Sequence, residues 1–173
     1  GSSTFEVQDI PALAEAAHAH GALLMLDNTW ATPLFFKAFE HGVDISIHAA
    51  TKYLVGHSDA MLGVIVTTET LYASVRETVR QLGYIASADD AYLGLRGLRT
   101  LGVRLRQHQR SALAVAQWLQ QRPEVAQVLH PALPEATGHA LFKRDFLGST
   151  GLFGVVLKPV YAPQAKAFLE SLQ

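Results

Sequence analysis

The chain contains no cysteine, which excludes disulfide bonds and zinc sites built on cysteine. It has no apolar run approaching the roughly 18 residues that a membrane-spanning helix needs. The net charge is −1, so no basic surface is expected for nucleic acid or an anionic membrane. Residues 1–5 are polar and lack the basic start of a secretory signal peptide. These absences predict a soluble, cytoplasmic protein without a nucleic-acid or membrane partner.

What is present is an ordinary globular composition. The chain has 173 residues, of which 49% are hydrophobic and 17% are charged. This balance provides a sizeable core and gives no sign of disorder. The length suits one domain or one and a half.

The first half of the chain alternates helical and strand patterns. Asp9 has the character of a helix N-cap, and Gly21 closes the helix that follows. Residues 22–26 form a continuous apolar run, typical of a strand buried on both faces. The alternation predicts an α/β fold with a largely parallel sheet. Helices are expected at residues 10–20, 34–41 and 68–82, and strands at 22–26, 43–47 and 62–66.

The second half begins with a long helical stretch, residues 91–121, that is interrupted near Gly97. Further strands are expected at 125–129 and 151–157, and a helix at 163–172. Because a helix this long often joins two domains, we expect residues 1–105 to belong to one domain and 106–173 to the first part of an incomplete second one. An apolar stripe is predicted on the long helix at Leu98, Leu101, Leu105, Ala112, Ala116 and Leu119, opposite a basic face of Arg99, Arg104, Arg106 and Arg110.

A lysine and an acid follow two predicted strands. Asp27 ends the apolar run, and Lys52 lies just beyond the next strand, in a loop rich in small and hydroxyl residues. In α/β sheets chemistry collects at the carboxyl ends of strands. A pyridoxal-phosphate (PLP) enzyme needs this pair, because the lysine forms a Schiff base and the acid holds the pyridine nitrogen protonated.

Each residue has a plainer reading as well. Most loop lysines are simply solvated, and an aspartate after a strand often caps the next turn. Against this, the flanking apolar residues predict a desolvated Lys52, whose neutral amine attacks aldehydes, and a buried Asp27 that needs a partner. Thr51 and Ser58 offer hydroxyls to a phosphate, although hydroxyls are common in loops.

Other chemistries find little support. No glycine-rich loop ends in Lys-Ser or Lys-Thr, so ATP hydrolysis by that route is not expected. The eight histidines show no spacing typical of a metal site, and no metal is predicted. The arginines from Arg96 onward form either a contact for phosphate or an acidic substrate, or, more commonly, a solvated or ion-paired helix face.

The sequence resembles the Cys/Met-metabolism family of PLP enzymes over essentially all 173 residues. The family implies a type I (aspartate-aminotransferase-like) fold, with a mainly parallel sheet flanked by helices and a smaller C-terminal α/β domain. It implies a covalent aldimine between PLP and Lys52, with Lys52 also catalytic, Asp27 at the pyridine nitrogen and Thr51 at the phosphate. Ala49 departs from a frequent family serine, which puts one phosphate hydroxyl in doubt. The resemblance is carried by Leu26-Asp-Asn-Thr29, Ala49-Ala-Thr-Lys-Tyr53, Gly56-His-Ser-Asp59, Arg96-Gly-Leu-Arg-Thr-Leu101, Val103-Arg-Leu-Arg106, His130-Pro-Ala-Leu133 and Lys143-Arg-Asp-Phe146.

Within the family, these motifs are most similar to those of members that cleave L-cystathionine by β-elimination, giving homocysteine, pyruvate and ammonia. The substrate implied is a small amino acid, and the assembly implied is a homo-oligomer, a tetramer built from dimers. Two alternatives remain open. One is a sister reaction, as in cystathionine γ-synthase, cystathionine γ-lyase or methionine γ-lyase, and the other is a fragment or paralogue without activity.

Overall fold

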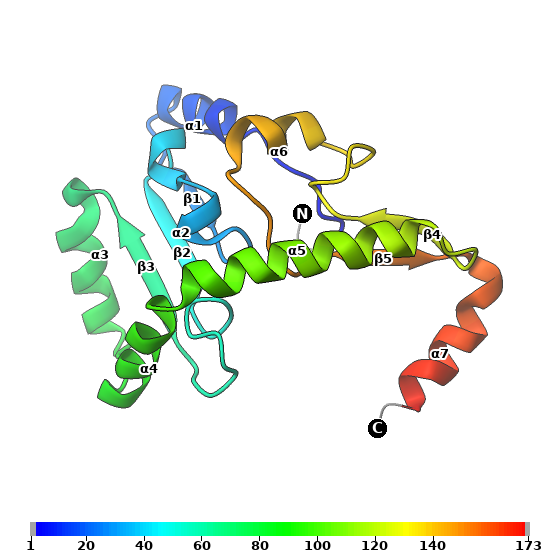
Figure 1. The fold of residues 1–173 in the computed structure, drawn as a ribbon. Helices are drawn as coiled ribbons and strands as arrows, with labels where there is room; N and C mark the ends of the chain where they lie inside the picture. The colour runs from blue at the N-terminus through cyan, green and yellow to red at the C-terminus, as the bar shows by residue number, and fades with distance from the viewer. Residues whose placement is uncertain (1–2, 172–173) are drawn as a thin grey trace.

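The computed structural model describes residues 3–171, which form an α/β structure with two separate sheets. Figure 1 shows the long helix α5 running from the three-stranded sheet at one side to the two-stranded sheet at the other. The predicted α/β class is therefore confirmed within the described residues. In chain order the elements of the first half are α1 (Ile10–Ala19), β1 (Met25–Asp27), α2 (Thr32–Phe35), η1 (Ala38–His41), β2 (Ile45–Ala49), β3 (Gly63–Thr67), α3 (Glu69–Gln81) and α4 (Ala88–Leu98).

The first sheet is mixed, with strand order β1-β2-β3. Strands β1 and β2 are parallel, as predicted, and Asp27 pairs with Ile47 in their register. Strand β3 runs antiparallel to β2, which the expectation of a largely parallel sheet did not include. The reason is the connection: only a loop joins β2 to β3, whereas a parallel pair needs a crossover that carries the chain back.

Strand β1 is shorter and less buried than predicted. Leu24 and Leu26 pack against the main core, but Leu23 and Met25 are 56% and 57% exposed. The expectation of a strand buried on both faces was thus wrong for the described part of the chain. A strand that alternates in this way has one covered and one open face.

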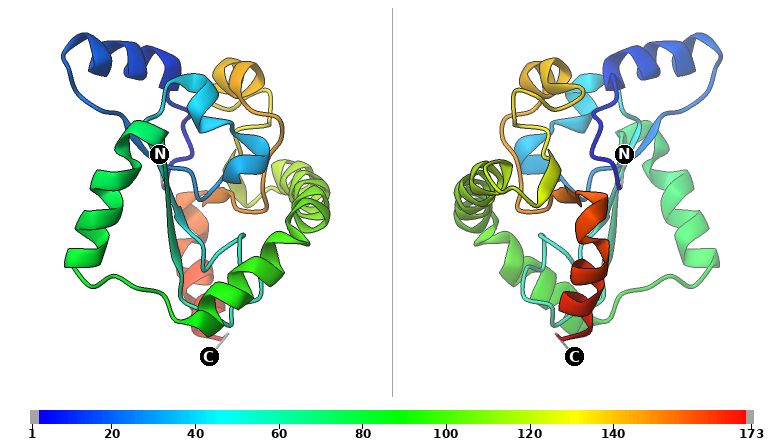
Figure 2. Two further views of the ribbon diagram at one scale, coloured as in Figure 1. Left: turned by 90° about the vertical axis from the view of Figure 1, so that its left-hand side faces the viewer. Right: turned by 90° about the vertical axis from the view of Figure 1, so that its right-hand side faces the viewer.

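The helices of the first half follow local capping signals. Asp9 caps α1, and its Oδ1 accepts a hydrogen bond of 3.3 Å from the Ala12 N–H. The helix predicted at 34–41 is split into α2 and η1, because Phe36 adopts an extended conformation between them. Helix α3 lies along one side of β3 and is joined to α4 by an extended stretch (Figure 2).

The second half contains α5 (Leu101–Gln120), and the interruption near Gly97 is confirmed as the corner between α4 and α5. Leu101 and Leu105 at the start of α5 belong to the first hydrophobic core, with Phe36. Ala116, near its end, belongs to a second core with Val128. Leu98, predicted in the apolar stripe, is instead 49% exposed. The remaining elements are β4 (Val125–Leu129), α6 (His139–Asp145), β5 (Gly154–Leu157), η2 (Pro159–Tyr161) and α7 (Ala162–Glu170).

Strands β4 and β5 pair antiparallel as the second sheet. Strand β4 lies where the sequence predicted it, and β5 begins three residues later than the predicted 151–157. Helix α7 projects from the end of this sheet (Figure 1). The helix predicted at 163–172 corresponds to α7, which ends at Glu170. Residue 172 of the predicted helix lies outside the described residues. Among residues 3–171, no helix is long and apolar enough to cross a membrane.

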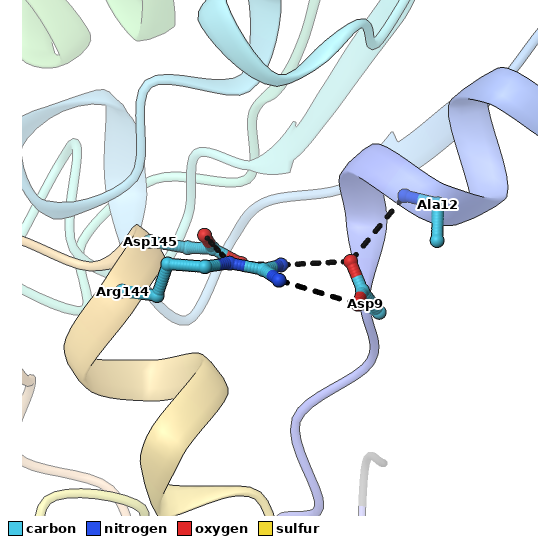
Figure 3. A network of polar contacts seen from close by, with 4 residues as sticks. All are labelled: Asp9, Ala12, Arg144 and Asp145. Atoms are coloured by element: carbon cyan, nitrogen blue, oxygen red, sulfur yellow. Dashed lines mark hydrogen bonds and ion pairs between the residues drawn. The ribbon is translucent and has the colours of Figure 1, made fainter.

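Helix α6 returns to the first half of the chain through Arg144. Its guanidinium bonds Asp145 (Nε to Oδ1, 2.6 Å) and Asp9 (Nη2 to Oδ1, 2.7 Å), as Figure 3 shows. Asp145 is buried, and the ring of Phe146 beside it packs against that of Phe36 in a tilted arrangement, with ring centroids 4.7 Å apart. The segment after α5 therefore packs against both cores.

Candidate active site

An open cavity of about 1310 Å³ lies at the carboxyl ends of β1 and β2. The structure brings all four polar residues singled out from the sequence, Asp27, Thr51, Lys52 and Ser58, to its wall. This is the edge where the ends of two parallel strands meet. Walls also come from residues 5–8 and from the segment around Phe146.

Lys52 stands in the turn that follows β2. Its backbone is fixed, because its N–H donates to the Ala49 carbonyl (3.0 Å) and its carbonyl accepts from the Gly56 N–H (2.8 Å). Its side chain is exposed, and among the described residues its amine has no hydrogen-bond or ion-pair partner. The predicted apolar surroundings of the ammonium group are therefore wrong here: Leu54 and Val55 of the same loop are buried, while Lys52 opens to the cavity.

Asp27 ends β1 and is also exposed, so the expected buried carboxylate was wrong. Its Oδ1 accepts a hydrogen bond of 2.9 Å from the Thr29 N–H, which is the turn-capping bond of the plainer reading. Thr29 also bonds to the other strand, because its Oγ1 accepts a hydrogen bond of 2.7 Å from the Ala49 N–H. The ends of β1 and β2 are thus tied together by one threonine, and this fixes Asp27 relative to the Lys52 loop.

Thr51 points its hydroxyl back into its own loop. Oγ1 accepts from the Leu62 N–H at 2.8 Å and lies 3.3 Å from the Leu62 carbonyl. This bond closes the loop between β2 and β3 next to Lys52. Ser58 has a positive φ of 57°, a left-handed conformation that is uncommon for a residue other than glycine.

The far wall is aromatic, and the sequence pattern gave it no role. Trp30 donates its indole N–H to the Leu152 carbonyl at 2.8 Å, and its ring meets Phe146 edge-on at 6.2 Å. Tyr53, directly after Lys52, meets the His108 ring edge-on at 5.6 Å. Phe146 ends a quoted motif and Trp30 directly follows another, Leu26-Asp-Asn-Thr29, which was the available signal, whereas nothing marked Leu152.

A buried histidine lies behind the strand ends. His48 on β2 is 2% exposed, and its Nε2 lies 3.1 Å from the Ser46 hydroxyl. Burial lowers its pKa, although the Asn28 backbone and the nearby Asp27 charge oppose that shift. Within residues 3–171, no group of three or more histidines and acids could hold a metal ion.

Comparison with known proteins places this geometry in a family. The model of the family described as "Cys/Met metabolism PLP-dependent enzyme" matches residues 1–173. The chain is 51% identical to a putative cystathionine beta-lyase of Rhizobium johnstonii, covering 100% of the chain and 45% of that protein. It is 54% identical to the cystathionine beta-lyase MetC of Escherichia coli, covering 91% and 40%. The chain therefore spans less than half the length of these curated relatives.

Solved structures agree on the fold. A cystathionine gamma synthase from Xanthomonas oryzae pv. oryzae, in complex with cystathionine, superposes with a TM-score of 0.93 at 36% identity. The superposition covers 99% of the chain and 44% of that structure. The predicted type I fold is confirmed.

Proposed function

Because the chain belongs to the Cys/Met-metabolism family of PLP-dependent enzymes, we propose that the protein carrying it is a carbon–sulfur lyase that cleaves L-cystathionine by β-elimination. The products are homocysteine, pyruvate and ammonia. The observation that carries this proposal is the opening of Lys52 and Asp27 onto one cavity, tied together by Thr29. The named relatives support cystathionine as the substrate.

The residues on the cavity wall fit PLP chemically. An aldehyde needs a primary amine, and a pyridine nitrogen needs an acid to stay protonated. Lys52 provides an amine and Asp27 a carboxylate, and only one oxygen of that carboxylate has a hydrogen-bond donor among residues 3–171. The cavity of about 1310 Å³ has room for the cofactor and a substrate.

PLP, when bound, supplies an electron sink for the charge that develops at the substrate Cα. Asp27 contributes a fixed negative charge, because the Thr29 N–H holds one oxygen and leaves the other free. The Lys52 amine would accept the proton of the substrate Cα as general base. The overall reaction would consume one water: homocysteine would leave from the β-carbon, and hydrolysis of the remaining three-carbon part would give pyruvate and ammonia.

Thr51 is proposed to assist at the cofactor phosphate. The bond from the Leu62 N–H occupies one lone pair of its hydroxyl, and the longer 3.3 Å approach to the Leu62 carbonyl is the weaker one. A phosphate oxygen would compete with that carbonyl for the hydroxyl proton.

The second candidate reaction is γ-elimination or γ-replacement. It is favoured by the close fit to cystathionine gamma synthase and by a cystathionine gamma-lyase of Dictyostelium discoideum, 38% identical to the chain. The two reactions differ in their keto-acid product, since β-elimination from cystathionine yields pyruvate and γ-elimination yields 2-oxobutyrate.

The test incubates the protein that carries this chain with PLP and L-cystathionine and identifies the keto acid. We expect pyruvate, and we expect Lys52→Ala to lose both turnover and the absorbance of lysine-bound PLP. Lys37→Ala, a change in an exposed lysine outside the cavity, is the matched control and should keep both. Formation of 2-oxobutyrate would select the second candidate, and no keto acid from the wild type would indicate an inactive paralogue.

Assembly and domain division are proposals of the same kind. We propose a homo-oligomer, a tetramer built from dimers, as the family resemblance implies. We also propose the division between residues 105 and 106, which is supported by the two cores that the two ends of α5 join.

A further inference from the structure

The guanidinium of Arg104 lies against the Lys52 loop, and Arg104, like Lys52, lines the cavity. Its Nη2 donates to the Gly97 carbonyl at 2.9 Å and approaches the Leu54 carbonyl at 3.5 Å. Its Nε donates to the Thr100 hydroxyl at 3.0 Å. One side chain therefore joins the corner between α4 and α5 to the loop that carries Lys52. The sequence had suggested a solvated basic face for Arg104, and the structure instead places its guanidinium against the Lys52 loop.

The contact is too close to allow a side chain between the two parts. Gly56 has a φ of +79°, and a Cβ placed there would collide with the Arg104 guanidinium. Gly97 on α4 is equally constrained, because a Cβ there would collide with the carbonyl oxygens of Leu54 and Val55. Both glycines let the loop backbone rest directly on the helix corner.

The backbone in contact with Arg104 is the turn that orients Lys52. The Val55 N–H donates to the Ala50 carbonyl and the Gly56 N–H donates to the Lys52 carbonyl, both at 2.8 Å. Leu54, whose carbonyl faces Arg104, lies inside this turn. A shift of the guanidinium would consequently change the direction in which the Lys52 side chain leaves the backbone.

The position of Arg104 is unfavourable by itself. Burial lowers the pKa of the guanidinium, and its Nη1 is buried without a hydrogen-bond partner among the described residues. Unpaired buried donors are uncommon in folded proteins, and they often coincide with functional sites. The neighbouring Arg96 pairs with Asp59 at 2.7 Å on the surface, at the far end of the same loop.

We propose that Arg104 is a positioning residue for Lys52: it supports the turn of residues 52–56 through its contacts with the turn backbone, and it thereby holds the amine in reach of the cofactor aldehyde. This inference rests on the proposed function, because it assumes that Lys52 is the residue that binds PLP. A misplacement on the order of 1 Å at a reacting group costs up to about a hundredfold in rate.

The test measures how fast apo protein binds PLP covalently, following the absorbance of lysine-bound PLP at several PLP concentrations. For Arg104→Met in the protein that carries this chain, we expect the rate constant at saturating PLP to fall by about tenfold or more. We expect the PLP concentration that gives half the maximal rate to stay near the wild-type value. Arg104→Lys, which keeps the charge but loses the fork of donors, should recover only part of the rate.

Arg99→Met is the matched control. Arg99 is an exposed arginine at the same corner, and its side chain makes no hydrogen bond or ion pair among residues 3–171. The rate of this variant should therefore equal that of the wild type. Thr100→Val removes the acceptor of the Arg104 Nε, together with the bond of 3.1 Å from the Thr100 hydroxyl to the Gly97 carbonyl. It should slow the covalent step as well, and it tests the inference if Arg104→Met does not fold.

The outcomes separate the two claims. If folded Arg104→Met or Thr100→Val binds PLP as fast as the wild type, the positioning role is wrong and the proposed function stands. A rate that falls only in proportion to the folded fraction, measured by near-UV circular dichroism, also overturns the positioning role. If wild-type Lys52 does not bind PLP, the proposed function is wrong.

Discussion

At the residue scale, the proposed active site consists of two side chains that open onto one cavity. Lys52 and Asp27 are both exposed to the cavity, and the backbone around each is fixed by short hydrogen bonds. Rigid backbone under a free functional group is the arrangement that holds reacting atoms in place.

We predict that Asp27→Asn lowers the rate of cystathionine cleavage by about a hundredfold or more, as removal of a preorganised charge does at other sites. The asparagine oxygen still accepts from the Thr29 N–H, so the shape of the turn is kept while the negative charge is lost. Covalent binding of PLP to Lys52 should persist. Steady-state pyruvate formation and the absorbance of lysine-bound PLP measure the two effects.

The control for that change is Asp59→Asn, at another carboxylate on the cavity wall. Asp59 is paired with Arg96 on the surface, and an exposed ion pair of this kind contributes little to the stability of the fold. A cleavage rate for Asp27→Asn similar to that of Asp59→Asn would show that the Asp27 charge is not used.

The positions of Asp27 and Lys52 at the ends of strands were predictable from the sequence, and their surroundings were not. Asp27 and Lys52 stand at strand ends, which the apolar runs before them revealed. Whether a residue at a strand end is covered depends on segments distant in the sequence, and the runs around Asp27 predicted burial that is absent. The contacts of Arg104 and Trp30 depend on Leu54 and Leu152, and no local pattern encodes such pairings.

At the scale of elements, α6 and the residues after it are held to α1 by charge. Arg144 bridges the N-cap Asp9 and the buried Asp145 (Figure 3). The bonds from Arg144, and next the Ala12 N–H, hold the pKa of the Asp9 carboxyl below its ordinary value. Phe146, which follows directly, forms part of the cavity wall. Residues 143–146 thus contribute both to the ion pairs that join α6 to α1 and to the cavity wall.

We predict that Asp9→Asn lowers the melting temperature at pH 7 and that the difference from the wild type shrinks in acid. Asparagine still caps α1, so the change removes mainly the charge that faces Arg144. Because the folded pKa of Asp9 is depressed, its stabilisation is complete above the ordinary carboxyl value of 3.8 and is lost as the pH falls through the lower folded value. Thermal unfolding between pH 7 and pH 3 measures the difference.

Glu77→Gln supplies the comparison, because the Glu77–Arg80 pair lies within the single helix α3. It should change the melting temperature less than Asp9→Asn, since it connects no second element. If the melting temperatures of Asp9→Asn and the wild type are equal at pH 7, or if their difference stays constant down to pH 3, the Arg144–Asp9 ion pair does not stabilise the fold in this way.

Helix and strand positions were mostly predictable. The Asp9 cap and the interruption near Gly97 are local signals, and β4 matches its predicted residues. The direction of β3 and the split between α2 and η1 were missed. They depend on the route of a loop and on one extended residue, Phe36, which packs into the core.

At the scale of the molecule, α5 joins two hydrophobic cores, and the segment of residues 139–153 lies across both. Phe146 packs against the first core and Phe153 against the second. The cavity consequently has walls from both halves of the chain. The order of the elements predicted the two halves, but not that the later one returns to complete the site.

The central claim is that Lys52 is the residue that binds PLP. It is tested most directly by reducing the PLP-loaded protein with borohydride, digesting it and locating the added mass by peptide sequencing in the mass spectrometer. The chain offers five lysines, Lys37, Lys52, Lys143, Lys158 and Lys166. The account predicts that the pyridoxyl group is found on Lys52, and its presence on another lysine, or on none, would contradict it.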